Sequence, residues 1–312
     1  MGNRDLDIPW KLIEPDDPSG SDMVDVSGVK RKWLDVAYDV KSPSQVLDIY
    51  LPETGDGPFP TYIFVHGGAF IAGDKQDVQF LLAADGVRRG YAVVSVEYRK
   101  GFESKAPAAL YDVKAAIRFL RAHAADYCLD PERFAIGGDS AGAYYAVFAA
   151  ATSAIPAFDG PEPAYPEQPG DVKAVVAQCG VYDLLTLTPP PEAEADAPKE
   201  FVPGTIPVNL MSIFVGVNPR LIPGLAALLN PLTFITADFP PTLVQVGKED
   251  AVVPCAESKR LAETIEARCG ADRVRLEMFD GWNHCALNHI VTPDWFMKAN
   301  MDRVFGFLDR TV

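Results

Sequence analysis

The sequence predicts an α/β protein with a mostly parallel central sheet, helices on both faces of the sheet and one inserted segment. Two observations support this prediction. Short apolar runs, typical of strands buried on both faces, alternate with longer segments of helical periodicity along most of the chain. This alternation stops over residues 184–235, where prolines and short apolar pieces replace it. A chain of 312 residues is long enough for one large α/β domain with such an insertion.

The start of the chain predicts an extension followed by two strands at the edge of the sheet. Residues 1–30 are polar and rich in Asp, Pro, Ser and Gly, and we interpret them as an N-terminal extension. Apolar and polar side chains then alternate over residues 33–40 and 45–51, with a Lys-Ser-Pro-Ser turn between them. Such alternation is typical of half-buried strands, so the two runs predict an antiparallel hairpin.

The remaining elements are expected to form parallel strands joined by right-handed crossovers. The predicted strands cover residues 62–65, 92–96, 134–137, 172–178, 242–246 and 274–279. The predicted helices cover residues 78–88, 108–124, 141–151, 256–268 and 293–308. We therefore expect a core formed by residues 31–183 and 236–312, and we interpret residues 184–235 as a cap or lid.

The centre of the predicted site is a Gly-Asp-Ser-Ala-Gly turn at residues 138–142. It joins a short apolar strand to an Ala-rich helix, which is the setting that a nucleophile elbow requires. Ser140 is the candidate nucleophile, and the helix N-terminus places positive backbone dipole near the negative charge that develops in the reaction. The five-residue pattern also occurs in unrelated loops, so its interpretation depends on the other strand ends.

A second motif, His-Gly-Gly-Ala-Phe at residues 66–70, directly follows the predicted strand 62–65. A Gly-rich backbone can turn its N–H groups toward a substrate carbonyl, and losing one such donor costs about 3 kcal/mol of transition-state stabilisation. We expect the N–H groups of Gly68 and Ala69 to act as donors, with Ala141, the residue after the nucleophile, as the third. The alternative is an ordinary Gly-rich turn.

Two further turns carry an acid and a base. Residues 247–254 follow one predicted strand and contain both Glu249 and Asp250, either of which could hold an imidazole in the tautomer that accepts the serine proton. Residues 281–284 (Gly-Trp-Asn-His) follow another predicted strand, so His284 is the candidate base. His289 is the only rival, and it is less favoured because it lies farther from the strand end.

Charge and composition exclude several classes of partner. The net charge of −15 and the pI of about 4.7 argue against nucleic acid and against anionic membranes. No apolar run is long enough to cross a membrane, and no secretory signal is visible.

The five cysteines are widely spaced and include no Cys-x-x-Cys pair, so we expect reduced thiols and a cytoplasmic protein. We expect no metal site, and the sequence leaves a homodimer open.

Together these motifs resemble the α/β-hydrolase carboxylesterases, and among them the bacterial esterases similar to hormone-sensitive lipase and to feruloyl esterases. The resemblance covers nearly the whole chain from about residue 33, apart from residues 184–235. It implies an α/β-hydrolase fold with Asp250, not Glu249, as the acid, and the order Ser140, Asp250, His284 is the expected one. Many members similar to hormone-sensitive lipase have His-Gly-Gly-Gly; Ala69 departs from that pattern and favours the feruloyl-esterase side.

The resulting hypothesis is a serine carboxylesterase that hydrolyses short-chain or aromatic acyl esters through an acyl-enzyme and needs no cofactor. The residues that we expect to line an acyl or aryl pocket are Phe70, Met211, Phe214 and Trp282. For Met211 and Phe214, the packed core of the cap is an equal alternative. The rival functions are an amidase or formamidase with the same triad, and a non-catalytic small-molecule receptor on the same fold.

Overall fold

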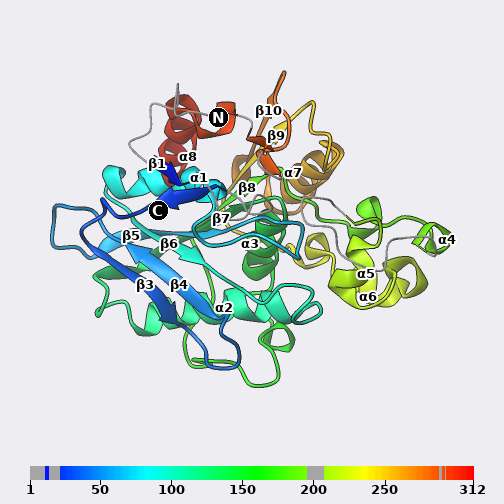
Figure 1. Cartoon of the computed structure of the whole chain (residues 1–312), viewed down its shortest axis with the longest axis horizontal. Coiled ribbons are helices and arrows are strands. Elements are labelled where there is room, and N and C mark those ends of the chain that lie inside the picture. Colours follow the sequence, from blue (N-terminus) through cyan, green and yellow to red (C-terminus); the bar gives the residue numbers. More distant parts are fainter. Residues whose placement is uncertain (1–10, 14–21, 195–206, 288–289, 292) are drawn as a thin grey trace.

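The computed structural model describes residues 11–13, 22–194, 207–287, 290–291 and 293–312. Its centre is an eight-stranded sheet with the strand order β10-β9-β8-β7-β5-β6-β4-β3 (Figure 1). The strands of this sheet are β3 (Lys32–Ala37), β4 (Val46–Tyr50), β5 (Phe59–Val65), β6 (Ala92–Val96), β7 (Leu129–Asp139), β8 (Ala174–Gln178), β9 (Thr242–Gly247) and β10 (Val274–Phe279). Two small antiparallel pairs lie outside it: β1 (Lys11–Ile13) with β2 (Met23–Asp25), and β11 (Ala286–Leu287) with β12 (Ile290–Val291).

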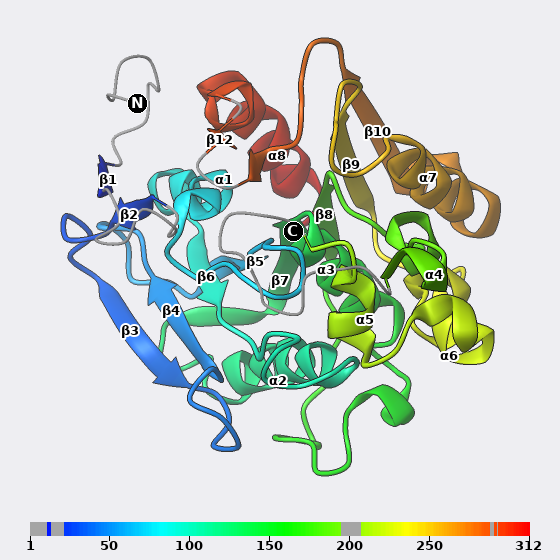
Figure 2. The ribbon, with the colours of Figure 1, turned by 45° about the vertical axis from the view of Figure 1, so that its right-hand side comes forward.

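Helices cover both faces of the sheet, as Figures 1 and 2 show. The α-helices are α1 (Leu81–Ala84), α2 (Ala108–Ala122), α3 (Ala141–Ala151), α4 (Pro191–Glu194), α5 (Leu210–Val215), α6 (Pro223–Leu228), α7 (Ala256–Cys269) and α8 (Lys298–Thr311). Side chains on β5 alternate between two apolar clusters, since Ile63 and Val65 pack with α2, α3 and α7, whereas Tyr62 and Phe64 pack with α1 and α8. The sheet is therefore buried on both faces, which explains its continuous apolar runs.

The predicted sheet topology is confirmed. β3 and β4 form an antiparallel hairpin, and β4 pairs antiparallel with β6. The neighbouring strands β6, β5, β7, β8, β9 and β10 are all parallel. The edge strand β3 is more exposed than a half-buried strand: Trp33 and Leu34 are 38% and 41% exposed. The predicted helix over residues 78–88 is divided into a 3-10 turn (Val78–Phe80), α1 and a second 3-10 turn (Asp85–Arg89).

One edge of the sheet collects the turns that carry the candidate residues. Because β5, β7, β8, β9 and β10 are parallel, their carboxyl ends lie at the same edge. The Gly-rich loop, the elbow, and the acid and histidine turns each follow one of these strands. Open α/β sheets bind ligands at this edge.

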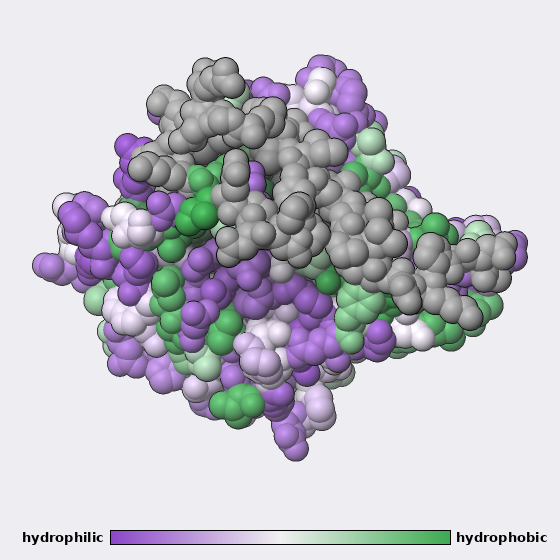
Figure 3. Space-filling model, in the orientation of Figure 1, coloured by the Kyte–Doolittle hydropathy of each residue, from purple (hydrophilic) through white to green (hydrophobic). Residues whose placement is uncertain are grey.

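The segment 184–235 leaves the sheet after β8 and returns to it at β9, with α4, α5 and α6 beside the sheet edge (Figure 1). It carries exposed apolar side chains at Val217, Leu221, Leu225 and Leu228, in the region where apolar colour gathers near α5 and α6 in Figure 3. Within the described parts of the chain, no helix is both long enough and apolar enough to cross a bilayer.

Candidate active site

Ser140 lies on a sharp turn between the end of β7 at Asp139 and the start of α3 at Ala141. Its backbone has φ 53° and ψ −119°, a conformation that costs energy for a residue with a side chain. Gly138 and Gly142 permit this turn: a Cβ atom on either would lie 2.3 Å or 1.9 Å from the carbonyl oxygen of Val65. The strained elbow that the sequence predicts is therefore the local conformation that the structure adopts.

The acid and histidine turns meet beside this elbow. The distance between His284 Nδ1 and Asp250 Oδ2 is 2.8 Å, and both side chains are almost completely buried. The second carboxylate oxygen of Asp250 accepts hydrogen bonds from the backbone N–H groups of Val252 and Val253. The structure therefore brings Asp250 to the histidine, whereas Glu249 is exposed.

Burial alone would lower the pKa of His284, because it disfavours the charged imidazolium. The neighbouring Cys179 and the hydrogen-bonded Asp250 outweigh that effect, so the pKa of His284 lies well above 6.5. An imidazole with a raised pKa is a stronger proton acceptor, which suits a general base.

Asn283 connects the two turns, and the sequence reasoning did not identify it. Its side-chain oxygen accepts hydrogen bonds from the backbone N–H groups of Ala251 and His284. The carbonyl of Trp282 also accepts a hydrogen bond from the N–H of Glu249. The side-chain amide of Asn283 thus links the acid turn to the histidine turn. In the sequence, only its position directly before His284 could have indicated this role.

The Gly-rich loop, which follows β5, has backbone N–H groups with no hydrogen-bond partner among the described residues. Gly68, Ala69 and Phe70 have φ values of 113°, 53° and 67°, all in the left-handed region. Within the described residues, the N–H groups of Gly68, Ala69 and Ala141 donate to no other group. They are therefore available to an oxygen atom of a ligand.

The preceding residues hold this loop in place. The N–H of Gly67 donates to Gln79 Oε1 and to Asp139 Oδ1. His66 is buried and stacks on Tyr98 with a ring separation of 4.5 Å. Burial, aided by Lys100, lowers the pKa of His66 to about 4, so its imidazole is neutral at neutral pH. Through these contacts His66 helps to hold its own loop in place.

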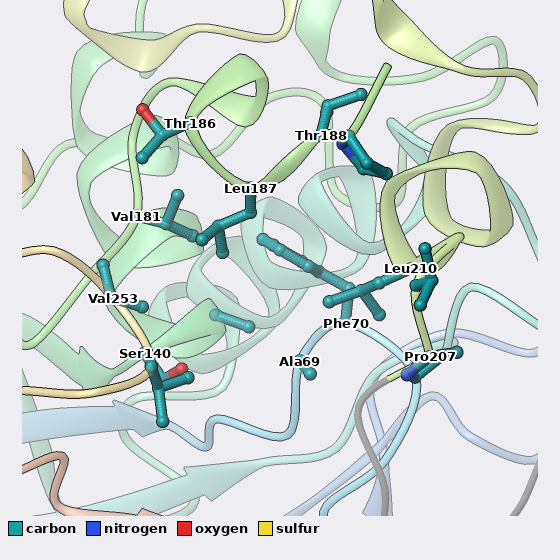
Figure 4. Close-up of a pocket in the computed structure, with 14 residues that line it drawn as sticks. Ala69, Phe70, Ser140, Val181, Thr186, Leu187, Thr188, Pro207, Leu210 and Val253 are labelled. Carbon is teal, nitrogen blue, oxygen red and sulfur yellow. The ribbon is translucent and has the colours of Figure 1, made fainter. Parts of the chain in front are cut away.

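A pocket of about 380 Å³ opens at Ser140 (Figure 4). Ala69, Phe70 and Ala141 form part of its wall. The rest comes from the acid turn, from residues after β8 and from the segment 184–235: Val181, Thr186, Leu187, Thr188, Pro189, Pro207, Val208, Leu210, Val252 and Val253. None of these residues carries a charge, so the pocket suits an uncharged group.

The four residues predicted to line the pocket are placed differently from one another. Phe70 lines it directly. Phe214 stacks on Phe70 with ring centroids 4.2 Å apart, and Met211 is buried in the same apolar cluster, so both lie behind the wall. Trp282 does not belong to the pocket: it stacks on Phe279 and packs with the α1 and α8 cluster on the opposite face of the sheet. The short histidine turn directs its ring toward that face.

Two buried cysteines complete the surroundings of His284, and sequence spacing gave no signal of their meeting. The donor atoms of Cys179, His284 and Cys285 lie within 4.8 Å of one another, the one group in the described residues that could hold a metal ion. A metal ion at this position would bind a nitrogen of the His284 imidazole. The absence of a metal site, which the sequence leads us to expect, stays a prediction.

Burial and hydrogen bonds shift the pKa values of Cys179 and of the nearby Asp139. Burial raises the pKa of Cys179, but its hydrogen bonds with Cys285 and His284, together with the charge of the imidazolium, lower it to about 5. Burial raises the pKa of Asp139 to about 7. The rival base, His289, lies outside the described residues.

The sheet order, the strained serine elbow and the turns at the strand ends define the class of this protein: it has the α/β-hydrolase fold. The chain belongs to the BD-FAE family, whose model matches residues 47–265. This confirms the resemblance to esterases of this fold.

Several proteins similar to this chain are named as esterases. Esterase LipQ of Mycobacterium tuberculosis is 31% identical over 74% of this chain and 52% of its own length. The probable carboxylic ester hydrolase LipM of the same organism is 30% identical over 74% of this chain and 51% of its own length. This chain thus spans about half the length of these relatives. Among solved structures, a truncated carbohydrate esterase from gut microbiota superposes with a TM-score of 0.74 at 26% identity, covering 90% of this chain and 95% of the other.

Proposed function

We propose that this protein is a serine carboxylesterase in which Ser140 is the nucleophile, His284 the general base and Asp250 the residue that orients the imidazole. One observation carries the proposal: Ser140 occupies a strained strand-to-helix turn on the wall of a pocket, and the buried Asp250–His284 pair follows neighbouring strands of the same sheet. Relatives that are named as esterases support the same reading.

The proposed reaction has two steps. Ser140 Oγ attacks the ester carbonyl carbon while His284 takes the hydroxyl proton, and Asp250 stabilises the imidazolium. The N–H groups of Gly68, Ala69 and Ala141 then hold the oxyanion. His284 returns the proton to the leaving alcohol, so that an acyl-enzyme remains on Ser140. Water, activated by His284, repeats the sequence and releases the acid.

The pocket supports short-chain or aromatic acyl esters as substrates. It is small and uncharged, and its wall includes the aromatic ring of Phe70, which Phe214 supports from behind by stacking. We propose that residues 184–235 act as the cap of this pocket, because Pro207, Val208 and Leu210 line it. The carbohydrate esterase among the similar structures makes acylated sugars a class of substrate to test.

The test is hydrolysis of acetyl, butyryl, octanoyl and feruloyl esters by the wild type, by Ser140→Ala and by Ser27→Ala as a control with an exposed serine. We expect turnover by the wild type and the control, and loss in Ser140→Ala with unchanged thermal unfolding. A slowly deacylating ester should leave its acyl group on Ser140, where peptide mass spectrometry would detect it.

Full activity of Ser140→Ala would refute the assignment of Ser140 as the nucleophile. Binding without turnover of any ester would favour a receptor, and faster turnover of matched amides would favour an amidase.

Two further expectations stay proposals. A cytoplasmic location is supported by cysteines that form no disulfide among the described residues. The formation of a homodimer would be tested by sedimentation of the full chain.

A further inference from the structure

Two thiols from distant parts of the chain meet beside the candidate active site. Cys179 directly follows β8, and Cys285 directly follows His284. Their Sγ atoms are 3.1 Å apart, and both side chains are completely buried. The backbone of Cys179 has φ 43°, in the strained left-handed region, and its N–H donates to the carbonyl of Gln245. The fold therefore constrains this cysteine in a conformation that brings its sulfur to Cys285.

The two cysteines form hydrogen bonds with residues next to the candidate nucleophile and with the candidate base. Cys285 Sγ donates to Asp139 Oδ2 at 2.9 Å, and Asp139 directly precedes Ser140. Cys179 hydrogen-bonds the side chain of His284. Donors around a sulfur favour its thiolate, which is the form that attacks oxidants. Cys179 is therefore the more reactive thiol, and Cys285 is the only thiol recorded in contact with it among the described residues.

We propose that Cys179 and Cys285 form a redox modification site, in which a hydroperoxide converts the two thiols into a disulfide and thereby lowers the activity of the adjacent site. The regulatory part of this proposal rests on the proposed function. The site adds a chemistry that the esterase reaction does not use, because neither thiol has a role in acyl transfer.

The reaction balances with the hydroperoxide as the only oxidant. The Cys179 thiolate attacks one peroxide oxygen, so that an S–O bond forms and the O–O bond breaks, and the alcohol or water produced takes a proton. Cys285 then attacks the sulfur of the resulting sulfenic acid. The S–S bond forms, the S–O bond breaks, and the departing hydroxide takes the Cys285 proton, through Asp139, to leave as water. The two sulfurs together lose two electrons, and the peroxide gains them.

The expected loss of activity follows from the position of Cys285 next to the base. Bond formation moves the two sulfurs together by roughly 1 Å. Cys285 is covalently attached to His284, so this movement shifts the imidazole relative to Ser140. It also removes the hydrogen bond that Asp139 accepts from Cys285. A displacement of about 1 Å of a catalytic group can cost about 10²-fold in rate.

The test uses the full chain treated with hydrogen peroxide, followed by alkylation of the remaining thiols. We expect non-reducing peptide mass spectrometry to find a cross-link between Cys179 and Cys285, with the loss of two hydrogen atoms from the intact mass. The kcat/KM for p-nitrophenyl acetate should fall at least about tenfold as the cross-link forms, and dithiothreitol should restore it. Cys285→Ser should form no disulfide under peroxide, because the second thiol is missing, whereas Cys269→Ser, the control at a distant thiol, should be cross-linked and inactivated like the wild type.

The mass measurement separates this proposal from the proposed function, because the cross-link can be detected whether or not the protein hydrolyses esters. Absence of the cross-link, with higher oxides on either thiol instead, would overturn the modification site. An unchanged kcat/KM in fully cross-linked protein would overturn its regulatory effect. If Cys285→Ser does not fold, the parallel time courses of cross-linking and inactivation in the wild type decide the question.

Discussion

Two regions of the molecule lie around Ser140, and they are held in place in different ways. One region consists of the turns after β7, β9 and β10, and the other is the segment 184–235. The turns depend on short hydrogen bonds around buried charge, such as those of Asp250 to two backbone N–H groups and to His284. The described parts of the segment consist of short helices that pack through apolar contacts, with some polar anchors, such as the hydrogen bond that Arg220 donates to the carbonyl of Thr188.

This difference predicts two kinds of mutational effect. Hydrogen-bonded buried charges tolerate few replacements, because a lost partner leaves another group unpaired. Apolar walls tolerate changes of volume more readily. Changes in the turns should therefore alter the rate for every ester, whereas changes in the segment should alter which ester reacts fastest.

The largest effect is expected from Asp250→Asn. The amide would hold His284 in the wrong tautomer, so kcat should fall about 10⁴-fold for all esters, without a change of fold by circular dichroism. Glu249→Gln removes the neighbouring exposed carboxylate and should keep its activity within about twofold. Similar losses in the two variants would contradict the assignment of the acid.

The next effect is the pH dependence of kcat/KM. The base must be neutral to accept a proton, and the pKa of His284 is raised above 6.5. Activity should therefore fall about tenfold per pH unit below a midpoint higher than 6.5. The residual activity of Asp250→Asn should show this midpoint at lower pH, because the carboxylate that favours the imidazolium is gone. A midpoint that stays unchanged in this variant would argue against the Asp250–His284 coupling.

A smaller, selective effect is expected from Leu210→Ala in the pocket wall. The shorter side chain should raise the octanoyl-to-acetyl ratio of kcat/KM by about tenfold, since space for one methylene group in an apolar pocket is worth about 1–3 kcal/mol. Leu228→Ala is the matched control, because Leu228 is 54% exposed and belongs to the same segment. An equal drop for all esters in Leu210→Ala would place this residue with the rate-setting turns.

The smallest effect is expected from Ala69→Gly. The proposed role of Ala69 belongs to its backbone N–H, and glycine keeps this group while it adopts φ 53° more easily. Initial-rate measurements should find kcat within about twofold of the wild type. A loss of tenfold or more would show that the methyl group itself takes part in the site.

Much of the fold and of the candidate site could be predicted because each piece has a local signature. The apolar runs of β5 and β6 identify strands buried on both faces, and Gly138 and Gly142 identify a turn that has no space for Cβ atoms. Parallel strands then bring their carboxyl ends together, so Ser140, Asp250 and His284 could be assigned to one edge from their positions after predicted strands.

The pocket could not be predicted in the same way. Trp282 is apolar and close to His284 in sequence, yet its ring packs on the opposite face of the sheet with Phe279. Met211 and Phe214 lie behind the wall, whereas Thr188 and Leu210 form it. Which side of a short helix or turn faces a pocket depends on packing against distant elements, and no local pattern records that packing.

Local patterns in the sequence were enough to predict the order of the strands along the chain, the strained elbow at Ser140 and the glycines that permit it, because backbone geometry and apolar periodicity are local properties. The family resemblance had already implied Asp250 as the acid, and the folded structure brings its carboxylate to His284. That Asn283 links the two turns and that Cys179 meets Cys285 could be seen only in the folded structure. Those contacts join residues 32 to 106 positions apart, or depend on the exact direction of a turn. They form only when the sheet aligns its strand ends.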